Sequence, residues 1–381
     1  MVTEHETPAN PVRCPAIAHP EAGLADPADF DALLARLGDP AGVAAAEDFP
    51  RGTLQPDGRL DLCKQGLGPL AAARVVQAAV RFPHATHLLL GTNGLGSDGA
   101  RAVADALAPG HHVQTVYLGC NRIDADGAGA LADRLAADAT VRALWLKRNP
   151  IGDEGVARLC AALAANTTLR TLDLVNTGLT RHGLQALAEV LAHRQTPLER
   201  LFLGGNGLRP DAVPALSAIV RDGRVRELYL AANHLGDDGA AALGEAVEGL
   251  PMTLGLGGNG LTPAGAAAMA ARLGAWTALD LARPPSERAL GALPNTVGDA
   301  GAAALAAVLP ASRLRRLDLR FTGITGRGAK LLLAALNDDM PLRYLGINHG
   351  VPRRLRRLAA ATLGPAEQPH PDISAIASVY R

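Results

Sequence analysis

The amino-acid sequence predicts an α/β solenoid, with parallel strands on a concave face and helices on a convex face. The clearest evidence is the run from Leu144 to Gly155, which reads Leu-x-Leu-x-x-Asn-x-Ile-x-x-x-Gly. A helix-period apolar pattern follows it through Leu159 and Leu163. One strand, one turn and one helix cannot bury a core alone, so neighbouring copies of the unit must cover it.

The pattern recurs along the chain at a nearly constant spacing. Most starts lie 25 to 29 residues apart, and a single gap measures 38 residues. A unit repeated at such a period is the signature of a solenoid with about eleven repeats. The repeats start at Leu60, Leu88, Val116, Leu144, Leu172, Leu201, Leu228, Leu254, Leu279, Leu317 and Leu345.

An asparagine column supports the repeat assignment. A buried amide can satisfy backbone groups that become open where each strand leaves the sheet, so stacked amides are expected to form a ladder. Gln65, Thr177 and Thr322 interrupt the column, and each threonine is expected to supply one bond. The column contains Asn93, Asn121, Asn149, Asn206, Asn233 and Asn259.

The spacing and the Leu-x-Leu-x-x-Asn-x-Leu core resemble the leucine-rich repeat family, in its ribonuclease-inhibitor-like class, over residues 58–350. Segments such as Gly-Ala-Gly-Ala-Leu ending at Leu131 also resemble the repeats of GALA effectors of plant-pathogenic bacteria. The resemblance implies a horseshoe-shaped solenoid that binds proteins. It identifies a fold rather than one function.

The termini are expected to cap this solenoid. Residues 1–57 predict an arm and one capping helix with Phe30, Leu33, Leu34 and Leu37 on its inner face. The long gap places an insertion at residues 282–294, which is either a functional loop or a tolerated lengthening. Residues 351–381 predict a capping helix with Leu355 and Leu358 inward. A short tail helix should follow, with Asp372 as N-cap and an apolar stripe of Ile373, Ile376, Val379 and Tyr380, docked on that cap.

Composition favours a protein partner over a nucleic acid or a membrane. Basic and acidic residues number 37 each, so the net charge is zero. No basic-then-apolar signal peptide and no apolar run of about twenty residues is apparent. Cys14, Cys63, Cys120 and Cys160 lack metal-ligand spacing and are expected to be thiols in a reducing compartment. We therefore predict a cytoplasmic protein without cofactor or metal, with a composition typical of a GC-rich bacterium.

The middle residue of each Leu-x-Leu strand should point to the concave face. Aromatic residues make up only 3% of the chain, yet four of them occur in this column within five repeats. Asp173 holds the column position in the remaining repeat of the five. Exposed aromatics around a charge are typical of interface hot spots, although they could also pack on one another as strand residues. A second copy of the chain or its own tail could also cover them. The candidate partner-binding residues are Tyr117, Trp145, Lys147, Arg148, Asp173, Phe202, Tyr229, Asp280, Asp318, Arg320 and Phe321.

Catalysis finds little support in the sequence. Asp280 and Asp318 lie one repeat apart, but Arg316 and Arg320 beside Asp318 favour ion pairs over a pair of catalytic carboxylates. The glycines follow the repeat period and not a phosphate-loop spacing. We therefore predict a non-catalytic scaffold that binds a protein or peptide on its concave surface. The alternatives are a secreted effector that recruits host machinery through its termini and a leucine-rich-repeat GTPase-activating protein.

Overall fold

The computed structural model describes residues 11–12, 23–284, 290–348, 350–363 and 367–380. The chain divides into two compact units, of which the first comprises residues 1–198 and 369–381 and the second residues 199–368. Both units are built from the same strand-turn-helix repeat, and the fold is an α/β leucine-rich repeat solenoid, as the repeat pattern predicts. Each unit is described separately below.

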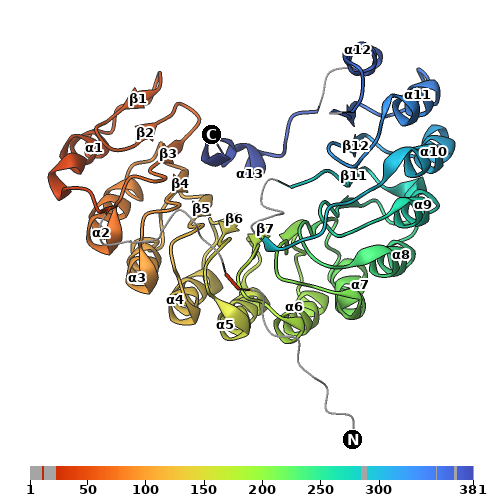
Figure 1. Ribbon diagram of the computed structural model, residues 1–381. Coiled ribbons are helices and arrows are strands. Elements are labelled where there is room, and N and C mark those ends of the chain that lie inside the picture. Colours follow the sequence, from red (N-terminus) through yellow and green to blue (C-terminus); the bar gives the residue numbers. More distant parts are fainter. Residues whose placement is uncertain (1–10, 13–22, 285–289, 349, 364–366, 381) are drawn as a thin grey trace, which may run out of the picture. The chain divides into compact units, whose positions relative to one another are not determined.

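In the first unit, short parallel strands alternate with helices that cover one face of the sheet (Figure 1). The helices lie on one side because each repeat turns apolar alanine, leucine and valine side chains toward the strands. The repeat elements are β3 (Arg59–Asp61), α2 (Gly68–Ala79), β4 (His87–Leu89), α3 (Gly96–Ala106), β5 (Thr115–Tyr117), α4 (Ala125–Ala136), β6 (Ala143–Trp145), α5 (Gly152–Ala165), β7 (Thr171–Asp173) and α6 (Arg181–His193).

The second unit has the same alternation of strands and helices. Its strands are also parallel, and the short helix η3 (Pro210–Ala212) precedes α7. The helices η4 (Leu273–Ala275) and η6 (Leu309–Ala311) are further single turns. The other elements are β8 (Arg200–Phe202), α7 (Val213–Arg221), β9 (Glu227–Tyr229), α8 (Gly236–Ala246), β10 (Thr253–Gly255), α9 (Pro263–Ala270), β11 (Ala278–Asp280), α10 (Gly298–Val308), β12 (Arg316–Asp318), α11 (Gly326–Ala334), β13 (Tyr344–Gly346) and α12 (Arg353–Thr362).

The strand register confirms the repeat assignment within each unit. The first leucine of each repeat pairs with its counterpart in the next repeat, as Leu60 does with Leu88 and Leu317 with Leu345. Because the register is shared, the residues that follow each leucine form straight columns across the sheet. A side chain at one column position therefore neighbours the same position of the adjacent repeats.

The asparagine ladder forms as predicted. Asn121, for example, accepts a hydrogen bond from the backbone N–H of Asn93 at 2.8 Å and donates to Leu90 and Leu118 carbonyls at 2.9 and 3.0 Å. Asn295 occupies the ladder position after the predicted insertion, where it accepts from Asn259 N–H at 3.0 Å. The extra residues therefore lie between Leu281 and Asn295, and their central part, 285–289, lies outside the described residues.

A second inter-repeat link, which the sequence analysis did not identify, joins the starts of neighbouring helices. Asp299, near the start of α10, accepts from the Thr325 N–H at 2.8 Å and from the Thr325 hydroxyl at 2.6 Å. Thr325 is also the N-cap of α11. The pairs Asp153 with Thr180 and Asp237 with Thr262 repeat this arrangement. These links explain why an aspartate at the start of one helix is followed by a threonine at the start of the next.

The N-terminal cap contains more structure than the predicted helix. Phe30, Leu33 and Leu37 are buried as expected, in the helices η2 (Pro27–Phe30) and α1 (Asp31–Leu37). An antiparallel pair, β1 (Glu47–Asp48) and β2 (Thr53–Leu54), follows and extends the sheet beyond β3. The prediction of a single capping helix therefore missed this hairpin, because two-residue strands carry no alternating pattern.

The C-terminal cap helix α12 forms, but its predicted inner face is wrong in part. Leu355 is half-buried, whereas Leu358 is 51% exposed and Ala359 is buried instead. Leu355 and Ala359 are four residues apart and share one helix face, so the small alanine takes the inner place. No helix among the described residues is long and apolar enough to cross a membrane.

The cysteine prediction is wrong at one position. Cys120 is disulfide-bonded, whereas Cys63 and Cys160 are free thiols. Cys14 lies outside the described residues. Spacing along the sequence could not show this bond, because a disulfide depends on which residues meet in space.

Candidate partner-binding surfaces

The predicted aromatic column of the first unit is assembled but buried. Strand register sets Tyr117 beside Trp145 and Trp145 beside Asp173. These side chains are only 3%, 2% and 2% exposed. The expectation that they form an exposed patch is therefore wrong for this unit, although their adjacency is confirmed.

Lys147 and Arg148 follow β6, where the chain turns out of the sheet. The Lys147 ammonium lies 5.5 Å from the centre of the Tyr117 ring, a cation–π distance. Burial lowers the pKa of Lys147 to about 8 and raises that of Asp173 to about 6, while the attraction between their opposite charges works against both shifts. Arg148 adopts a left-handed backbone with φ of 57°, which lets its N–H donate to the Val175 carbonyl at 2.8 Å.

The chain's own C-terminal segment lies on the strand face of the first unit. It contains α13 (Pro371–Ser374) and η7 (Ala377–Tyr380), and Figure 1 shows α13 on the side of the sheet away from α2 to α5. The hydroxyl of Thr171 in β7 donates to Asp372 Oδ2 at 2.6 Å. The prediction that this tail docks on the C-terminal cap is therefore wrong.

The tail also uses different residues from those predicted. His370, not Asp372, is the N-cap of α13, since its side chain accepts from the Asp372 N–H. Asp372 is instead buried against the sheet, and Ile376 is buried while Ile373 is half-buried. A carboxylate directly before the first residue of an apolar stripe has the sequence pattern of a cap, which explains the error.

In the second unit, Phe202 and Tyr229 form a stacked pair. Their ring centroids are 4.3 Å apart and nearly parallel, at 5°. The Tyr229 hydroxyl donates to Glu227 at 2.9 Å, and Arg200 lies 2.9 Å from the same carboxylate. Both rings are half-buried, so this part of the predicted site is present but its aromatic faces are partly used by each other.

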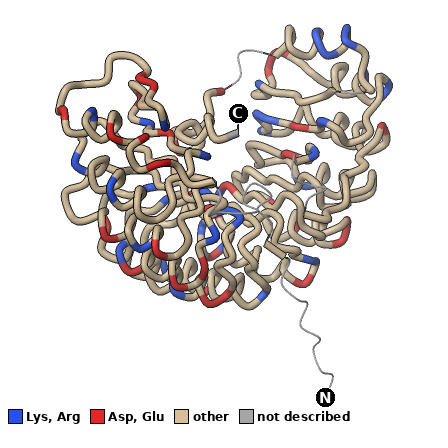
Figure 2. Tube along the Cα trace, turned by 60° about the vertical axis from the view of Figure 1, so that its left-hand side comes forward, with Lys and Arg blue, Asp and Glu red and all other residues tan. Residues whose placement is uncertain are grey.

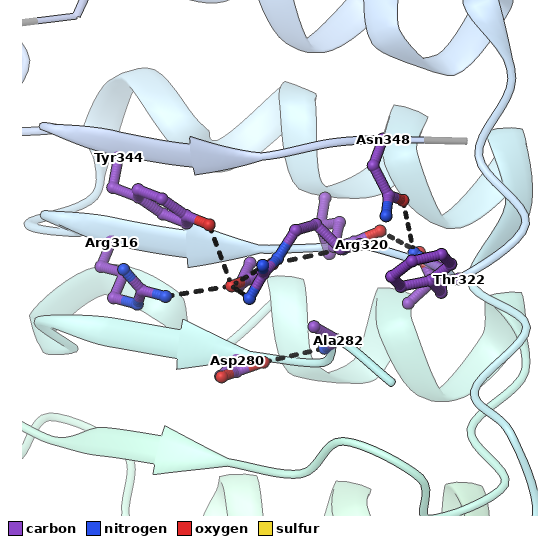
Figure 3. A network of polar contacts seen from close by, with 10 residues as sticks. Asp280, Ala282, Arg316, Arg320, Thr322, Tyr344 and Asn348 are labelled. Atoms are coloured by element: carbon purple, nitrogen blue, oxygen red, sulfur yellow. Dashed lines mark hydrogen bonds and ion pairs between the residues drawn. The ribbon is translucent and has the colours of Figure 1, made fainter. Parts of the chain in front are cut away.

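The most organised polar group of the second unit surrounds Asp318 (Figure 3). The Asp318 side chain is fully buried and accepts from Arg316 at 3.0 Å and from Arg320 at 2.9 Å. Tyr344 donates its hydroxyl at 3.2 Å, and the Arg316 guanidinium lies 3.8 Å from the centre of its ring. The ion pairs predicted for Asp318 are therefore confirmed. Both guanidinium groups are held in place while roughly half of each side chain stays exposed.

Asp280 lies beside Asp318 in the next strand, as the register requires. Burial, together with the negative charge of Asp318, raises the pKa of Asp280 to about 6. Its carboxylate accepts from the Ala282 N–H at 2.8 Å (Figure 3). The two carboxylates therefore differ, because Asp318 is paired with arginines while Asp280 faces a backbone group.

Phe321 is the large exposed aromatic residue of this group. Its side chain is 45% exposed, and its backbone is left-handed with φ of 61°. The conformation is strained for a side chain of this size. Its N–H donates to the Asn348 side chain at 2.8 Å, which holds the turn (Figure 3). Phe321, Arg316 and Arg320 thus form one polar and aromatic surface, called here the Asp318 surface.

Several residues of these surfaces precede the first leucine of their repeats. Thr171, Glu227, Arg200 and Tyr344 occupy this position, which was not read as a column from the sequence. Its signal was available, because residues on either side of a buried strand residue share the opposite face of the sheet. Basic and acidic residues are interspersed along the backbone of both units (Figure 2). No cluster of metal-binding side chains occurs within the described part of the chain.

A sequence model described as "Leucine Rich repeat" matches residues 111–132, 137–160, 165–188, 225–244 and 313–333. The chain contains leucine-rich repeats. Their matched segments occur in both units, so the repeat identity does not rest on one unit alone. No curated protein sequence matches the chain significantly.

Two solved structures with detectable similarity to this chain are the following. A chain from the crystal structure of the yeast Rad7 and Elc1 complex is 14% identical, with a TM-score of 0.45, over 74% of this chain and 75% of that one. The actin-binding site 2 of leiomodin-1 is 18% identical, with a TM-score of 0.32, over 43% of this chain and 88% of that one.

Proposed function

We propose that this protein is a non-catalytic scaffold that binds a protein or peptide partner, and that the Asp318 surface is one contact site. The observation that carries this proposal is the pre-organised group of Arg316, Arg320 and Phe321. Two exposed guanidiniums are fixed by one buried carboxylate, so little side-chain freedom remains to be lost when a partner binds. Arginine and aromatic side chains are also those most enriched at binding hot spots.

The exposed ring of Phe321 supports a binding role. The corresponding turn position has a left-handed backbone in most repeats, with glycine at Gly205 and Gly258 and polar or small residues, such as Lys64 and Ala232, in others. Phe321 places a large aromatic ring there that is 45% exposed, which is a reason to expect that the ring contacts another molecule. Local charge is nearly balanced by Asp318 and Asp280, which favours a protein partner over a nucleic acid.

The test uses Phe321→Gly, which removes the aromatic ring and relieves the strained backbone. Leu331→Ala is the matched control, because Leu331 is similarly exposed at 43% but lies on helix α11. A random peptide library is selected against the wild-type protein. We expect bound peptides to lose at least about ten-fold in affinity with Phe321→Gly and to bind Leu331→Ala unchanged. A selection without binders, or binders indifferent to Phe321, contradicts the proposal.

The finer assignments stay predictions. The 28-residue spacing supports the ribonuclease-inhibitor-like class, while the bacterial origin, the effector role and the GTPase-activating role rest on resemblance or composition. For the location, free thiols at Cys63 and Cys160 favour a reducing compartment, whereas the disulfide at Cys120 favours an oxidising one. Alkylation of thiols in intact cells, before lysis, distinguishes the two.

A further inference from the structure

The C-terminal segment presents one defined face to the first unit. Asp372 is 8% exposed and Ile376 is 1% exposed, and Ala375 between them is also buried. Spacings of three and four residues place these side chains on one side of a helical turn. Pro371 and Ser374 on the other side are exposed. The segment therefore carries a recognisable pattern of a carboxylate, a small residue and an aliphatic residue.

The receiving surface is one register position on strands β4 to β7 of the first unit, which is polar except at Ala143 of β6. Thr171 binds Asp372 directly, and Thr115 and His87 occupy the same register position on β5 and β4. His87 Nδ1 and the Thr115 hydroxyl are 2.9 Å apart. Burial lowers the pKa of His87, while the charges of Asp57 and Asp372 act in the opposite direction and that of nearby Arg59 adds to the lowering. The Thr171 hydroxyl thus binds the carboxylate of the segment, and the charge of that carboxylate acts on His87.

The segment leaves part of this surface empty. A cavity of about 420 Å³ lies between its end and the N-terminal hairpin. Phe49 and Pro50 line it on one side, Cys63 and Gln65 on the sheet side, and Val379 at the segment. A ligand with a larger side chain in place of Val379 could therefore fill space that the segment does not use.

We propose that this face of the first unit is a groove for a short segment of a partner protein, and that residues 369–380 occupy it as a built-in competitor. The partner segment carries a carboxylate followed, three and four residues later, by a small and an aliphatic side chain. The inference extends the proposed binding function to a second surface. A four-residue helix is marginal by itself, and a buried carboxylate loses its hydration on docking, so the tail can be displaced.

The test measures how tightly the segment binds as a separate peptide. A fluorescent peptide of residues 367–381 is titrated into the full-length protein and into a variant that ends at residue 368. We expect saturable binding to the shortened variant and at least about ten-fold weaker binding to the full-length protein, whose groove is occupied. The peptide carrying Asp372→Asn should bind at least about ten-fold more weakly than the native peptide. A random library selected on the shortened variant should enrich the carboxylate-small-aliphatic pattern.

Two substitutions locate the binding. Thr171→Val in the shortened variant should weaken the peptide by a similar factor, whereas Thr253→Val, at the equivalent register position of the second unit, should leave it unchanged. The proposal is wrong if a folded shortened variant does not bind the peptide, if both proteins bind it equally, or if the library enriches an unrelated pattern. Should the shortened variant not fold, hydrogen exchange of full-length Thr171→Val replaces it. Faster exchange confined to residues 371–376 supports the groove, and unchanged exchange refutes it.

Failure of this proposal is distinguishable from failure of the proposed function. The peptide titration reports only on the first unit, whereas the Phe321→Gly comparison reports on the second. If binders depend on Phe321 but the shortened variant does not bind the tail peptide, the proposed scaffold function stands and the proposed groove is wrong.

Discussion

Replacing one amide of the asparagine ladder should destabilise the first unit by several kcal/mol. Asn149 is fully buried and makes four hydrogen bonds. Its oxygen accepts from the N–H groups of Asn121 and Ile123 at 2.9 and 3.1 Å, and its nitrogen donates to the carbonyls of Leu118 and Leu146 at 3.0 and 2.9 Å. Alanine would leave all four backbone groups buried and unpaired.

The magnitude follows from those four bonds. At about 1 kcal/mol for each bond, Asn149→Ala should lower the free energy of unfolding by about 4 kcal/mol. Asn149→Thr should cost about 3 kcal/mol, because a threonine hydroxyl can keep one bond. Thr177 and Thr322 show that bond in this fold, since they donate to Leu174 and Leu319 at 3.0 and 2.7 Å.

Urea unfolding is the assay, followed by tryptophan fluorescence. In a Trp276→Phe background the remaining tryptophan is Trp145, which belongs to the first unit and lies four residues before Asn149. Asn337→Ala on the exposed surface serves as control and should stay within about 0.5 kcal/mol of the parent. An Asn149→Ala loss no larger than the control, or a threonine variant no more stable than the alanine variant, would refute the ladder as a source of stability.

Two further substitutions test the second unit. Asp280→Asn should raise stability by about 1 to 3 kcal/mol at pH 8, because the folded state holds this carboxyl at a pKa of about 6 while the unfolded state holds it near 3.8. The ionised Asp280 therefore destabilises the folded state increasingly as pH rises from about 4 through 6. The stability gained by Asp280→Asn should vanish near pH 3. If urea unfolding shows a gain that does not depend on pH, this explanation is wrong. Thr325→Val should cost about 1 to 2 kcal/mol at pH 7, because the cap of α11 and its bond to Asp299 are lost. The Thr325 hydroxyl keeps the pKa of Asp299 low, so this cost should shrink as pH falls below about 4, and a cost that is the same at pH 3 and 7 would argue against the link.

The periodic part of this fold could be predicted from the sequence because the repeats share one pattern of apolar and asparagine residues. The start residues Leu60 and Leu345 and those between them all lie in strands, and the ladder amides make the expected bonds. Such features depend on neighbours one repeat away, which the period itself supplies. The Asp–Thr links were equally periodic, and they were missed because aspartate and threonine were not compared between helix starts.

The surfaces were predicted less well because exposure depends on segments outside the period. Tyr117 and Phe202 occupy the same column position, yet one is buried and the other half-buried. The position of Asp372 relative to Thr171 spans 201 residues of sequence and has no repeat signal. Likewise, the bond at Cys120 could not be inferred from local spacing.

The functional candidates of this chain are therefore found where the repeat is broken. A left-handed turn position that holds Lys64, Ala232 or Gly205 in other repeats holds an exposed Phe321. At a column position that also holds Asp173 and Asp280, the buried Asp318 binds two arginines. In a solenoid, a residue that obeys the period is explained by packing against its neighbours, whereas a residue that departs from it at a cost needs another reason. The exposed ring of Phe321 and the buried carboxylate of Asp372 are such departures, and we propose contact with a second molecule for the first and docking of a displaceable tail for the second.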